Sequence, residues 1–398
     1  MNSNIYKLYT IAQKDSRLIV GLMSGTSLDG LDIVLCMIKG NGVETQLQVI
    51  AFETMEYSHS FRNEIKSVFS KVDVNMETLC AMNAKIGITH AHLVNNALKK
   101  WNIDAEQVDL IASHGQTVFH APKFSIQNAG FPNSTLQIGD GDHIAVNTGI
   151  ITVSDFRQKH IAAGGEGAPL VIYGDYLLFS HPKENRIMLN IGGISNFTFL
   201  PAGRKNQGLF ATDVGPGNTL MNLYAQQYFS KAYDENGDIA TSGKVNKRLL
   251  RSLMSHLFFS REFPKTTGAE LFNLSFLLRA QIKSDTERID QTDVMATLCS
   301  FTAQCISNAI LSIKKEYSDL HIYVSGGGYN NPVLMKMLAD NLSGIPIEST
   351  SILGTDPDAK EAVLFSLLAN EAIAGKAITF PAMAGAPAVC FGKISFPV

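Results

Sequence analysis

The sequence lacks any run of 18 or more apolar residues, the length that an α-helix needs to cross a membrane. We therefore expect no transmembrane helix. Its first residues also lack the long apolar core and the small-residue cleavage site of a secretion signal. The net charge is only −3, which indicates neither nucleic acid nor an anionic membrane surface as a partner. These absences favour a cytoplasmic protein.

Cysteine is scarce, and its five residues are scattered and mostly lie in apolar runs: Cys36, Cys80, Cys299, Cys305 and Cys390. An odd, scattered set is typical of buried free thiols in a reducing compartment. No Cys-x-x-Cys or His-Glu-x-x-His spacing occurs, so no zinc site is predicted.

Three widespread catalytic motifs are also missing. No Gly-Lys pair continues into the Ser or Thr that completes a P-loop, because Gly243, Gly375 and Gly392 begin Gly-Lys-Val, Gly-Lys-Ala and Gly-Lys-Ile. No Gly-x-Gly-x-x-Gly follows an expected strand, and no Gly-x-Ser-x-Gly is present. A P-loop kinase is therefore excluded, and neither a Rossmann dehydrogenase nor a serine hydrolase is supported.

Helical and strand patterns alternate along the 398 residues, which predicts an α/β protein, and the length favours two domains. Two hairpins, at 18–36 and 186–200, share one layout of apolar strand, glycine-rich polar tip and apolar strand. They begin about 170 residues apart, so each would open one α/β half. Coincidental similarity of two glycine-containing hairpins is the alternative.

The tip of the first hairpin consists of Gly, Ser, Thr and Asp, with Asp29-Gly30 as the expected turn. Glycine N–H groups can surround an anion, and Thr26 and Ser27 add hydroxyl groups. Asp29 and Asp32 supply oxygens suited to hydrated Mg²⁺. Such a tip would hold the β- and γ-phosphates of ATP, whereas an ordinary surface hairpin of the same composition is the alternative.

Asp213 follows an apolar segment and precedes Val-Gly-Pro-Gly-Asn, which places it at a strand end beside a tight turn. Gly215 and Gly217 would bring backbone N–H groups close to phosphate, and Asn218 would cap the following helix. An isolated Asp before a Gly-Pro turn is, however, usually a turn or cap residue. A triglycine at 326–328 either passes beneath an adenine ring or forms a flexible connection.

Three further polar residues are candidates for substrate binding. His114 ends an expected strand, where it would donate to a sugar oxygen or serve as a structural hydrogen-bonding group. Asp155 and Arg157 would lie on one face of a strand, since they alternate. A guanidinium binds a carboxylate through two hydrogen bonds, so Arg157 is suited to an acidic substrate, while Asp155 could simply hold it.

Glu361 begins a helix, where the dipole favours a carboxylate in any case.

The motifs together are more specific than any one of them. In chain order they are GLMSGTSLDGLD (21–32), SHGQT (113–117), LQIG (136–139), DFR (155–157), AAGGEGAPL (162–170), LNIGGISN (189–196), DVGPGN (213–218), the triglycine and Glu361. This order resembles the anhydro-N-acetylmuramic acid kinase family, bacterial sugar kinases of the actin, hexokinase and Hsp70 ATPase superfamily. The resemblance covers nearly the whole chain from residue 18. It fails at residues 1–17, which precede the usual start, and at 139–142, where the family often has Gly-Asn-Pro.

The resemblance implies an α/β fold of two RNase H-like (actin-like ATPase) domains with a nucleotide cleft between them. The first domain would comprise residues 1–180 and 371–398, and the second residues 181–370. ATP and Mg²⁺ would be the cofactors, and a homodimer is expected from the family.

The implied reaction converts 1,6-anhydro-N-acetylmuramic acid, water and ATP into N-acetylmuramic acid 6-phosphate and ADP, in peptidoglycan recycling and amino-sugar catabolism. The general base would be Asp213. The substrate-binding residues would be His114, Asp155 and Arg157, the last of them on the lactyl carboxylate. The Mg²⁺ ligands would be Glu361 and Asp32. The ATP-binding residues would be Gly25, Thr26, Ser27, Leu28, Asp29, Gly30, Leu31, Asp32, Gly215, Gly217, Asn218, Gly326, Gly327 and Gly328.

Two other functions stay open on the sequence. A kinase for another sugar, with or without an anhydro bridge, would tolerate replacement of Arg157 if its substrate has no carboxylate. A non-kinase actin-like or Hsp70-like ATPase would turn over ATP without sugar and form filaments or bind peptides, although the chain has no long extra segment for client binding.

Overall fold

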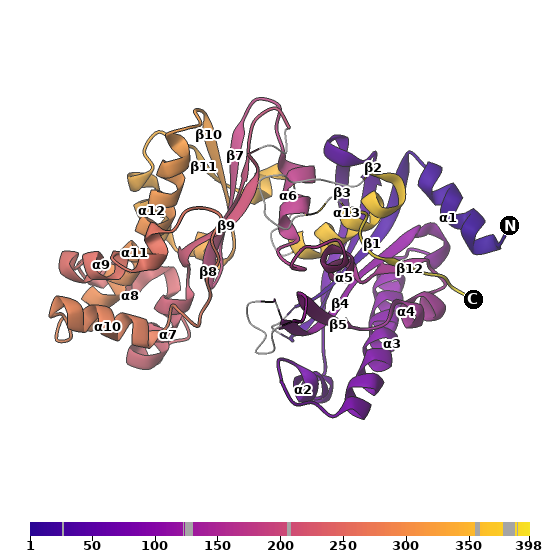
Figure 1. The fold of residues 1–398 in the computed structure, drawn as a ribbon, viewed down its shortest axis with the longest axis horizontal. Helices are drawn as coiled ribbons and strands as arrows, with labels where there is room; N and C mark the ends of the chain where they lie inside the picture. The colour runs from indigo at the N-terminus through magenta and orange to yellow at the C-terminus, as the bar shows by residue number, and fades with distance from the viewer. Residues whose placement is uncertain are drawn as a thin grey trace. The chain divides into compact units, whose positions relative to one another are not determined.

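The computed structural model describes residues 1–25, 28–121, 123, 130–204, 208–354, 359–376, 387 and 389–398. The chain divides into two compact units (Figure 1). The first comprises Met1–Phe179 and Gly354–Val398, and the second comprises Ser180–Leu353.

The first unit is built on a sheet with the strand order β12-β6-β4-β1-β2-β3, to which β5 adds by pairing with β4. Strand β1 is antiparallel to β2 and parallel to β4, and β4 is parallel to β6. The strands are β1 (Ser16–Ser24), β2 (Gly30–Lys39), β3 (Gln46–Glu56), β4 (Leu110–Ala121), β5 (Ser134–Ile138), β6 (Thr152–Ser154) and β12 (Lys393–Ser395).

The helices of the first unit are α1 (Ser3–Gln13), α2 (His59–Val68), α3 (Met76–Lys100), α4 (Gly141–Thr148), α5 (Phe156–Ala162), α6 (Val171–Phe179) and α13 (Lys360–Ala374). Helix α13 packs against β1, β2 and β4, although some 340 residues separate it from β1. It comes so close because Gly21 has no side chain: a Cβ there would lie 2.2 Å from the carbonyl oxygen of Ala362. The boundary expected at residue 370 therefore lies at 353 instead.

The second unit has a sheet with the order β11-β10-β7-β8-β9. Strand β7 is antiparallel to β8 and parallel to β10, and β10 is parallel to β11. This repeats the arrangement of β1, β2, β4 and β6 in the first unit. The two similar hairpins therefore belong to two units whose sheets share this topology. The strands are β7 (Asn185–Ile191), β8 (Ile194–Leu200), β9 (Phe210–Pro216), β10 (Leu320–Ser325) and β11 (Ile347–Ser349).

The helices of the second unit are α7 (Thr219–Phe229), α8 (Asp238–Ser242), α9 (Lys247–Met254), α10 (Leu274–Ser284), α11 (Gln291–Lys314) and α12 (Pro332–Asn341). In the part of the chain that the structure describes, α11 alone has the length and composition to cross a membrane. Its most apolar window is 78% buried inside the protein, and its side chains supply much of the core of this unit. We therefore interpret α11 as a core helix.

Candidate active site

The first hairpin has a longer tip than the sequence predicts. Strand β2 begins at Gly30, and Met23 pairs with Asp32, so Asp29-Gly30 is not the centre of a two-residue turn. Gly30 is needed by the sheet itself, since a Cβ there would lie 2.6 Å from the carbonyl oxygen of Met55 on β3. Two predicted phosphate contacts, Thr26 and Ser27, lie outside the described residues.

The remaining residues of this tip divide by burial. Leu28 and Leu31 are buried in the core of the first unit, so only their backbone atoms could reach a ligand. Asp29 is exposed, and its carbonyl oxygen accepts a hydrogen bond from the Tyr57 N–H at 2.9 Å. Gly25 is half-buried. Backbone groups are therefore the part of the described tip that is best suited to contact a ligand.

The second hairpin has a tip that is tied to the DVGPGN turn by backbone hydrogen bonds. The Gly217 N–H donates to the carbonyl oxygen of Gly193, and the Asn218 N–H donates to that of Gly192, both at 2.8 Å. The prediction that the Gly217 N–H would face a phosphate is therefore wrong. Gly217 is required instead for close approach, because a Cβ there would lie 2.2 Å from the Gly192 oxygen.

Asn218 and Gly215 also differ from the sequence expectation. Asn218 occupies the N-cap position of α7, but its side chain makes no capping hydrogen bond and donates to the Ile191 carbonyl oxygen at 3.3 Å. A Cβ on Gly215 would lie 3.0 Å from the Cβ of Cys305 on the core helix α11. Packing within the second unit thus accounts for this glycine.

The triglycine after β10 has one position that packing does not explain. A Cβ on Gly326 would lie 2.6 Å from Asn190 Oδ1, and a Cβ on Gly328 would lie 2.2 Å from Ile191 Cγ2. Both glycines are therefore required by contact with the end of β7. At Gly327 the nearest atom to a Cβ would be 3.8 Å away, which is ordinary contact distance. Gly327 is the member of the three that borders free space.

Asp213 lies within β9, three residues before its end. Its N–H donates to the carbonyl oxygen of Lys265 at 2.9 Å, and its Oδ2 accepts the Thr267 N–H at 2.8 Å. The segment 265–267 therefore holds both the backbone and the carboxylate of Asp213. Desolvation raises the pKa of Asp213; the Thr267 hydrogen bond opposes this rise and the negative charge of Glu270 adds to it.

Arg157, which is half-buried, forms a pair with the buried His114 in the first unit. The Arg157 Nε–H donates to His114 Nε2 at 2.8 Å, and an Nη1–H donates to the carbonyl oxygen of Gly167 at 2.9 Å. His114 Nδ1 lies 2.8 Å from the Gly115 carbonyl oxygen. Because Nε2 accepts, Nδ1 must carry the proton, so His114 is neutral and both ring nitrogens are occupied.

This pairing changes the role expected for His114. Burial, and then the positive charge of Arg157, lower the pKa of His114 well below its usual value. The sequence suggested that His114 donates to a sugar oxygen. Because both of its ring nitrogens are engaged, it cannot do so, and it holds Arg157 instead. Arg157 keeps the second N–H of Nη1 and both N–H groups of Nη2 for a ligand, since no described residue bonds to them.

Asp155 contacts neither His114 nor Arg157 in hydrogen-bonding distance. Strand β6 ends at Ser154, Asp155 has a left-handed backbone with φ of 57°, and Arg157 already belongs to α5. The expectation that the two alternate on one strand face is therefore wrong. Asp155 Oδ2 accepts from Lys393 Nζ on β12 at 2.8 Å, an ion pair across the β6–β12 edge.

Glu361 and Asp32 test whether the chain suits Mg²⁺. Desolvation raises the pKa of Glu361; the charge of Arg157 opposes this, and the charge of Asp32 adds to it. The side chain of Glu361 is exposed, so solvent moderates the desolvation. A carboxylate whose pKa is raised by a second carboxylate nearby fits a divalent cation, because Mg²⁺ usually takes one or two carboxylates plus substrate phosphates. Among the described residues, no group of three or more potential metal ligands exists.

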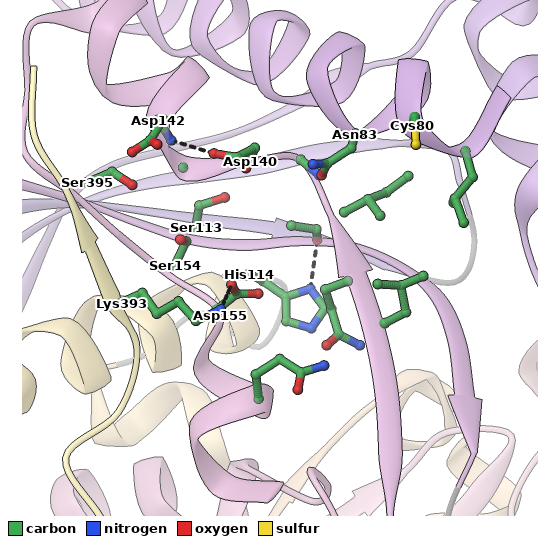
Figure 2. A pocket seen from close by; sticks show the side chains of 18 of the residues that line it. Cys80, Asn83, Ser113, His114, Asp140, Asp142, Ser154, Asp155, Lys393 and Ser395 are labelled. Atoms are coloured by element: carbon green, nitrogen blue, oxygen red, sulfur yellow. Dashed lines mark hydrogen bonds and ion pairs between the residues drawn. The ribbon is translucent and has the colours of Figure 1, made fainter. Parts of the chain in front are cut away.

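A pocket of about 580 Å³ lies in the first unit, lined by residues of α3, β4, β5, α4, β6 and β12 (Figure 2). Its lining includes His114 and Asp155 but not Arg157. Ser113 Oγ, also in the lining, is buried and has no hydrogen-bond partner in the described structure. The pocket and the N–H groups that Arg157 keeps for a ligand are therefore different places.

Comparison with known proteins decides between the possible functions. The sequence matches the family described as anhydro-N-acetylmuramic acid kinase over residues 17–397. The chain belongs to this family. A kinase of that name from Pseudoalteromonas atlantica is 51% identical over 402 residues, with 100% of each chain covered. Another from Bacillus anthracis is 38% identical over 386 residues, covering 95% of this chain and 99% of the relative.

A solved structure, the activator of the 2-hydroxyisocaproyl-CoA dehydratase from Clostridium difficile with bound ADPNP, shares 12% identity at a TM-score of 0.41. The alignment covers 89% of this chain and 95% of that one. Membership of the kinase family confirms the resemblance seen in the motifs, and the chain is accordingly a kinase. The nucleotide cleft that the resemblance implies stays a prediction.

Three residues of this anhydro-N-acetylmuramic acid kinase family member were missed by sequence reasoning. Thr267 holds the Asp213 carboxylate, Gly167 holds Arg157, and Lys393 holds Asp155. Each lies at least 10 residues from its partner. Two signals were available: Thr267 lies in the polar PKTTG segment, and Gly167 lies in the AAGGEGAPL motif. Nothing in the sequence around Lys393 points to its role.

Proposed function

We propose that this kinase transfers the γ-phosphoryl group of ATP to O6 of 1,6-anhydro-N-acetylmuramic acid while water opens the anhydro ring. The products are N-acetylmuramic acid 6-phosphate and ADP. Family membership supports the reaction, and the observation that carries the choice of residue is the setting of Asp213. Its Oδ2 is held by the Thr267 N–H, no described residue donates to Oδ1, and its raised pKa suits a general base.

Asp213 would accept the proton of water through Oδ1. The water oxygen bonds to the anomeric carbon as the bond from that carbon to O6 breaks, and O6 bonds to the γ-phosphorus as the bridge to ADP breaks. One proton remains on Asp213 and leaves to solvent after product release. A positioned base contributes about 10²–10⁴-fold to such a rate, and positioning of the phosphates supplies much of the rest.

Arg157 would bind the lactyl carboxylate of the sugar. It has N–H groups to spare on both Nη atoms, which allows two parallel hydrogen bonds to one carboxylate. His114 and Gly167 fix the plane of the guanidinium by accepting from its other N–H groups. His114 is thus a positioning residue, and Asp155 would act only by joining β6 to β12 through Lys393.

ATP would contact the backbone of the first hairpin tip and the free space at Gly327. Asp32 and Glu361 would hold Mg²⁺, which when bound neutralises charge on the transferring phosphate. Asp32 is oriented by Thr54, whose hydroxyl donates to Asp32 Oδ1 at 2.6 Å.

We also propose a cytoplasmic location in cell-wall recycling and amino-sugar catabolism, and a homodimer. The five free cysteines support a reducing compartment. The family supports the pathway and the dimer, and light scattering of the purified protein measures the latter directly.

A panel of sugars tests the proposed substrate. ADP release is measured with 1,6-anhydro-N-acetylmuramic acid, with 1,6-anhydro-N-acetylglucosamine, which lacks the lactyl group, and with N-acetylmuramic acid. We expect efficient turnover of the first alone. Arg157→Gln should raise KM for the acid about 10–100-fold, since it removes charged hydrogen bonds worth about 1.5–3 kcal/mol, and should leave KM for the neutral anhydrosugar unchanged.

Each alternative gives a distinct result in the same panel. Equal turnover of the neutral anhydrosugar, with no effect of Arg157→Gln, would indicate a kinase for another sugar. ATP turnover that no sugar stimulates would indicate a non-kinase ATPase and would overturn the proposal.

A further inference from the structure

Ser24, the last residue of β1, belongs to a buried chain of hydrogen bonds beneath the first hairpin tip. His90 Nε2 on α3 lies 2.8 Å from the hydroxyl of Tyr57, which follows β3. That hydroxyl lies 2.8 Å from Ser24 Oγ, and Ser24 Oγ donates to Gln116 Oε1 on β4 at 2.6 Å. None of these four side chains is more than 3% exposed.

The donors and acceptors along this chain of hydrogen bonds can be assigned in only one way. Gln116 Nε2 donates to the carbonyl oxygens of Gly25 and Thr117, which fixes the amide so that Oε1 faces Ser24. Ser24 therefore donates to Gln116 and must accept from Tyr57. Tyr57 in turn must accept from His90, so His90 carries its proton on Nε2. His90 Nδ1 is buried without a partner, which agrees with a neutral imidazole whose pKa burial lowers to about 3.

Tyr57 and Gln116 hold the tip at both ends. At the β1 end, the Tyr57 hydroxyl donates to Ser24 and Gln116 donates to the Gly25 carbonyl oxygen. At the β2 end, the Tyr57 N–H donates to the Asp29 carbonyl oxygen at 2.9 Å. The tip of the second hairpin is held differently, by backbone N–H groups of the DVGPGN turn. Side-chain hydrogen bonds thus hold much of the first tip, whereas backbone hydrogen bonds hold the second tip.

Core packing alone does not account for these four polar groups. Burying a hydroxyl, an imidazole and an amide costs desolvation free energy, and His90 Nδ1 recovers none of it. Apolar side chains of similar size would fill the same volume without that cost. What the polar chain adds is a unique orientation of Ser24 and Gly25 at the start of the tip.

We propose that Tyr57, His90 and Gln116 are positioning residues that fix Gly25 and Asp29, at the two ends of the first hairpin tip, for binding of the ATP phosphates. This inference rests on the proposed function for the nucleotide role of the tip. The hydrogen-bond chain ends at the Gly25 carbonyl oxygen, so it acts on the backbone of the tip. Its buried side chains are not proposed to bind substrate. Its loss should therefore affect ATP and leave the sugar unaffected.

Tyr57→Phe removes one hydroxyl and keeps the ring, and Tyr173→Phe is its matched control. Tyr173 is equally buried in the first unit. Its hydroxyl donates to the Pro387 carbonyl oxygen, which is not part of the hydrogen-bond chain of Ser24, Tyr57, His90 and Gln116. In the nucleotide-free enzyme, Tyr57→Phe should raise amide hydrogen exchange of the peptide from Ser24 to Leu31 about tenfold. KM for ATP should rise by a similar factor, with KM for the sugar within about twofold of the wild type. Tyr173→Phe should change none of these.

His90 provides the conservative rescue. Gln carries an N–H at nearly the distance of His Nε2, so His90→Gln should restore KM for ATP to near the wild-type value. His90→Leu lacks the donor and should behave like Tyr57→Phe. Equal changes in Tyr57→Phe and Tyr173→Phe, or identical behaviour of the two His90 variants, would overturn the inference and reduce the chain to a structural role.

The two proposals fail in different ways. Wild-type enzyme that does not turn over ATP with any sugar would overturn the proposed function and the nucleotide role together. The exchange contrast between Tyr57→Phe and Tyr173→Phe is measured without nucleotide, so it still decides whether the chain holds the tip.

Discussion

At the scale of single residues, the proposed mechanism assigns the chemistry to two side chains, and backbone groups hold both. Asp213 is held by the Thr267 N–H and Arg157 by the Gly167 carbonyl oxygen, with His114 as a third support. In each case one edge of the polar group is fixed and another is left for a ligand. This division is what positions a base and a carboxylate-binding group before substrate arrives.

The raised pKa of Asp213 predicts the acid limb of the pH–rate profile. A base must be deprotonated, so kcat/KM should fall as the pH drops through the pKa of Asp213, which lies higher than that of an ordinary aspartate. Glu270→Gln removes a negative neighbour and should move this limb to lower pH. Glu262→Gln changes an exposed carboxylate three residues before Lys265 that is not a cause of the shift, so this control should leave the limb in place. An unmoved limb in Glu270→Gln would contradict the assignment of the base.

Asp155 should matter little to the sugar. Its partner Lys393 is an exposed lysine, and exposed ion pairs contribute about 0–1 kcal/mol to the free energy of unfolding. Asp155→Asn should therefore keep KM for the anhydrosugar acid within about twofold, in contrast to Arg157→Gln. A KM for Asp155→Asn that rises as far as that of Arg157→Gln would show that Asp155 binds the substrate directly.

At the scale of elements, close approaches explain most glycines of the motifs. Gly21→Ala would place a Cβ 2.2 Å from the Ala362 carbonyl oxygen and force α13 away from β1. Overpacking of this kind costs about 1–3 kcal/mol, and here backbone atoms must move, so we expect the upper end. Urea denaturation measures the loss. Unchanged stability would mean that α13 does not pack on β1 as described.

Gly327→Ala separates a ligand-binding glycine from a structural one. Its Cβ would have free space, so the free energy of unfolding should stay within about 0.5 kcal/mol of the wild type. If the nucleotide passes this glycine, KM for ATP should rise while KM for the sugar does not. Gly328→Ala, which would meet Ile191 at 2.2 Å, should instead lose stability. An unchanged KM for ATP in Gly327→Ala would remove the triglycine from the ATP-binding residues.

Local patterns predicted the elements better than the contacts between them. The sequence patterns at 75–98 and 293–316 predict helices, and the structure has α3 (Met76–Lys100) and α11 (Gln291–Lys314) there. The strand expected to carry Asp155 and Arg157 ends at Ser154, because a left-handed residue starts a helix there. The hydrogen bond from Gly217 to Gly193 and the packing of α13 join distant segments. No short-range pattern could show either.

At the scale of the whole molecule, neutral buried histidines should make the first unit sensitive to acid. Burial lowers the pKa of His90 to about 3 and of His160 to about 4, and it lowers that of His114 well below its usual value. The unfolded chain binds protons near pH 6.5. Below that pH the unfolded state holds more protons than the folded state, so stability must fall as the pH decreases.

Each of these histidines should remove up to about 1.4 kcal/mol of unfolding free energy per pH unit below 6.5. Trp101, the single tryptophan, packs against the core of the first unit, so its fluorescence in urea titrations reports on that unit. Titrations at pH 7.5, 6.5 and 5.5 should show a loss that steepens at the lower end. Stability that is constant or rises over this range would contradict neutral burial of the three histidines.

The most direct test of the central claim follows the oxygen of water into the product. The enzyme is incubated with ATP, Mg²⁺ and 1,6-anhydro-N-acetylmuramic acid in ¹⁸O-labelled water, and the product is examined by ³¹P and ¹³C NMR. We predict a 6-phosphorylated sugar with ¹⁸O on the anomeric carbon, formed about 10²–10⁴-fold more slowly by Asp213→Asn that still binds ATP. Label in inorganic phosphate alone, or undiminished turnover by Asp213→Asn, would contradict the account.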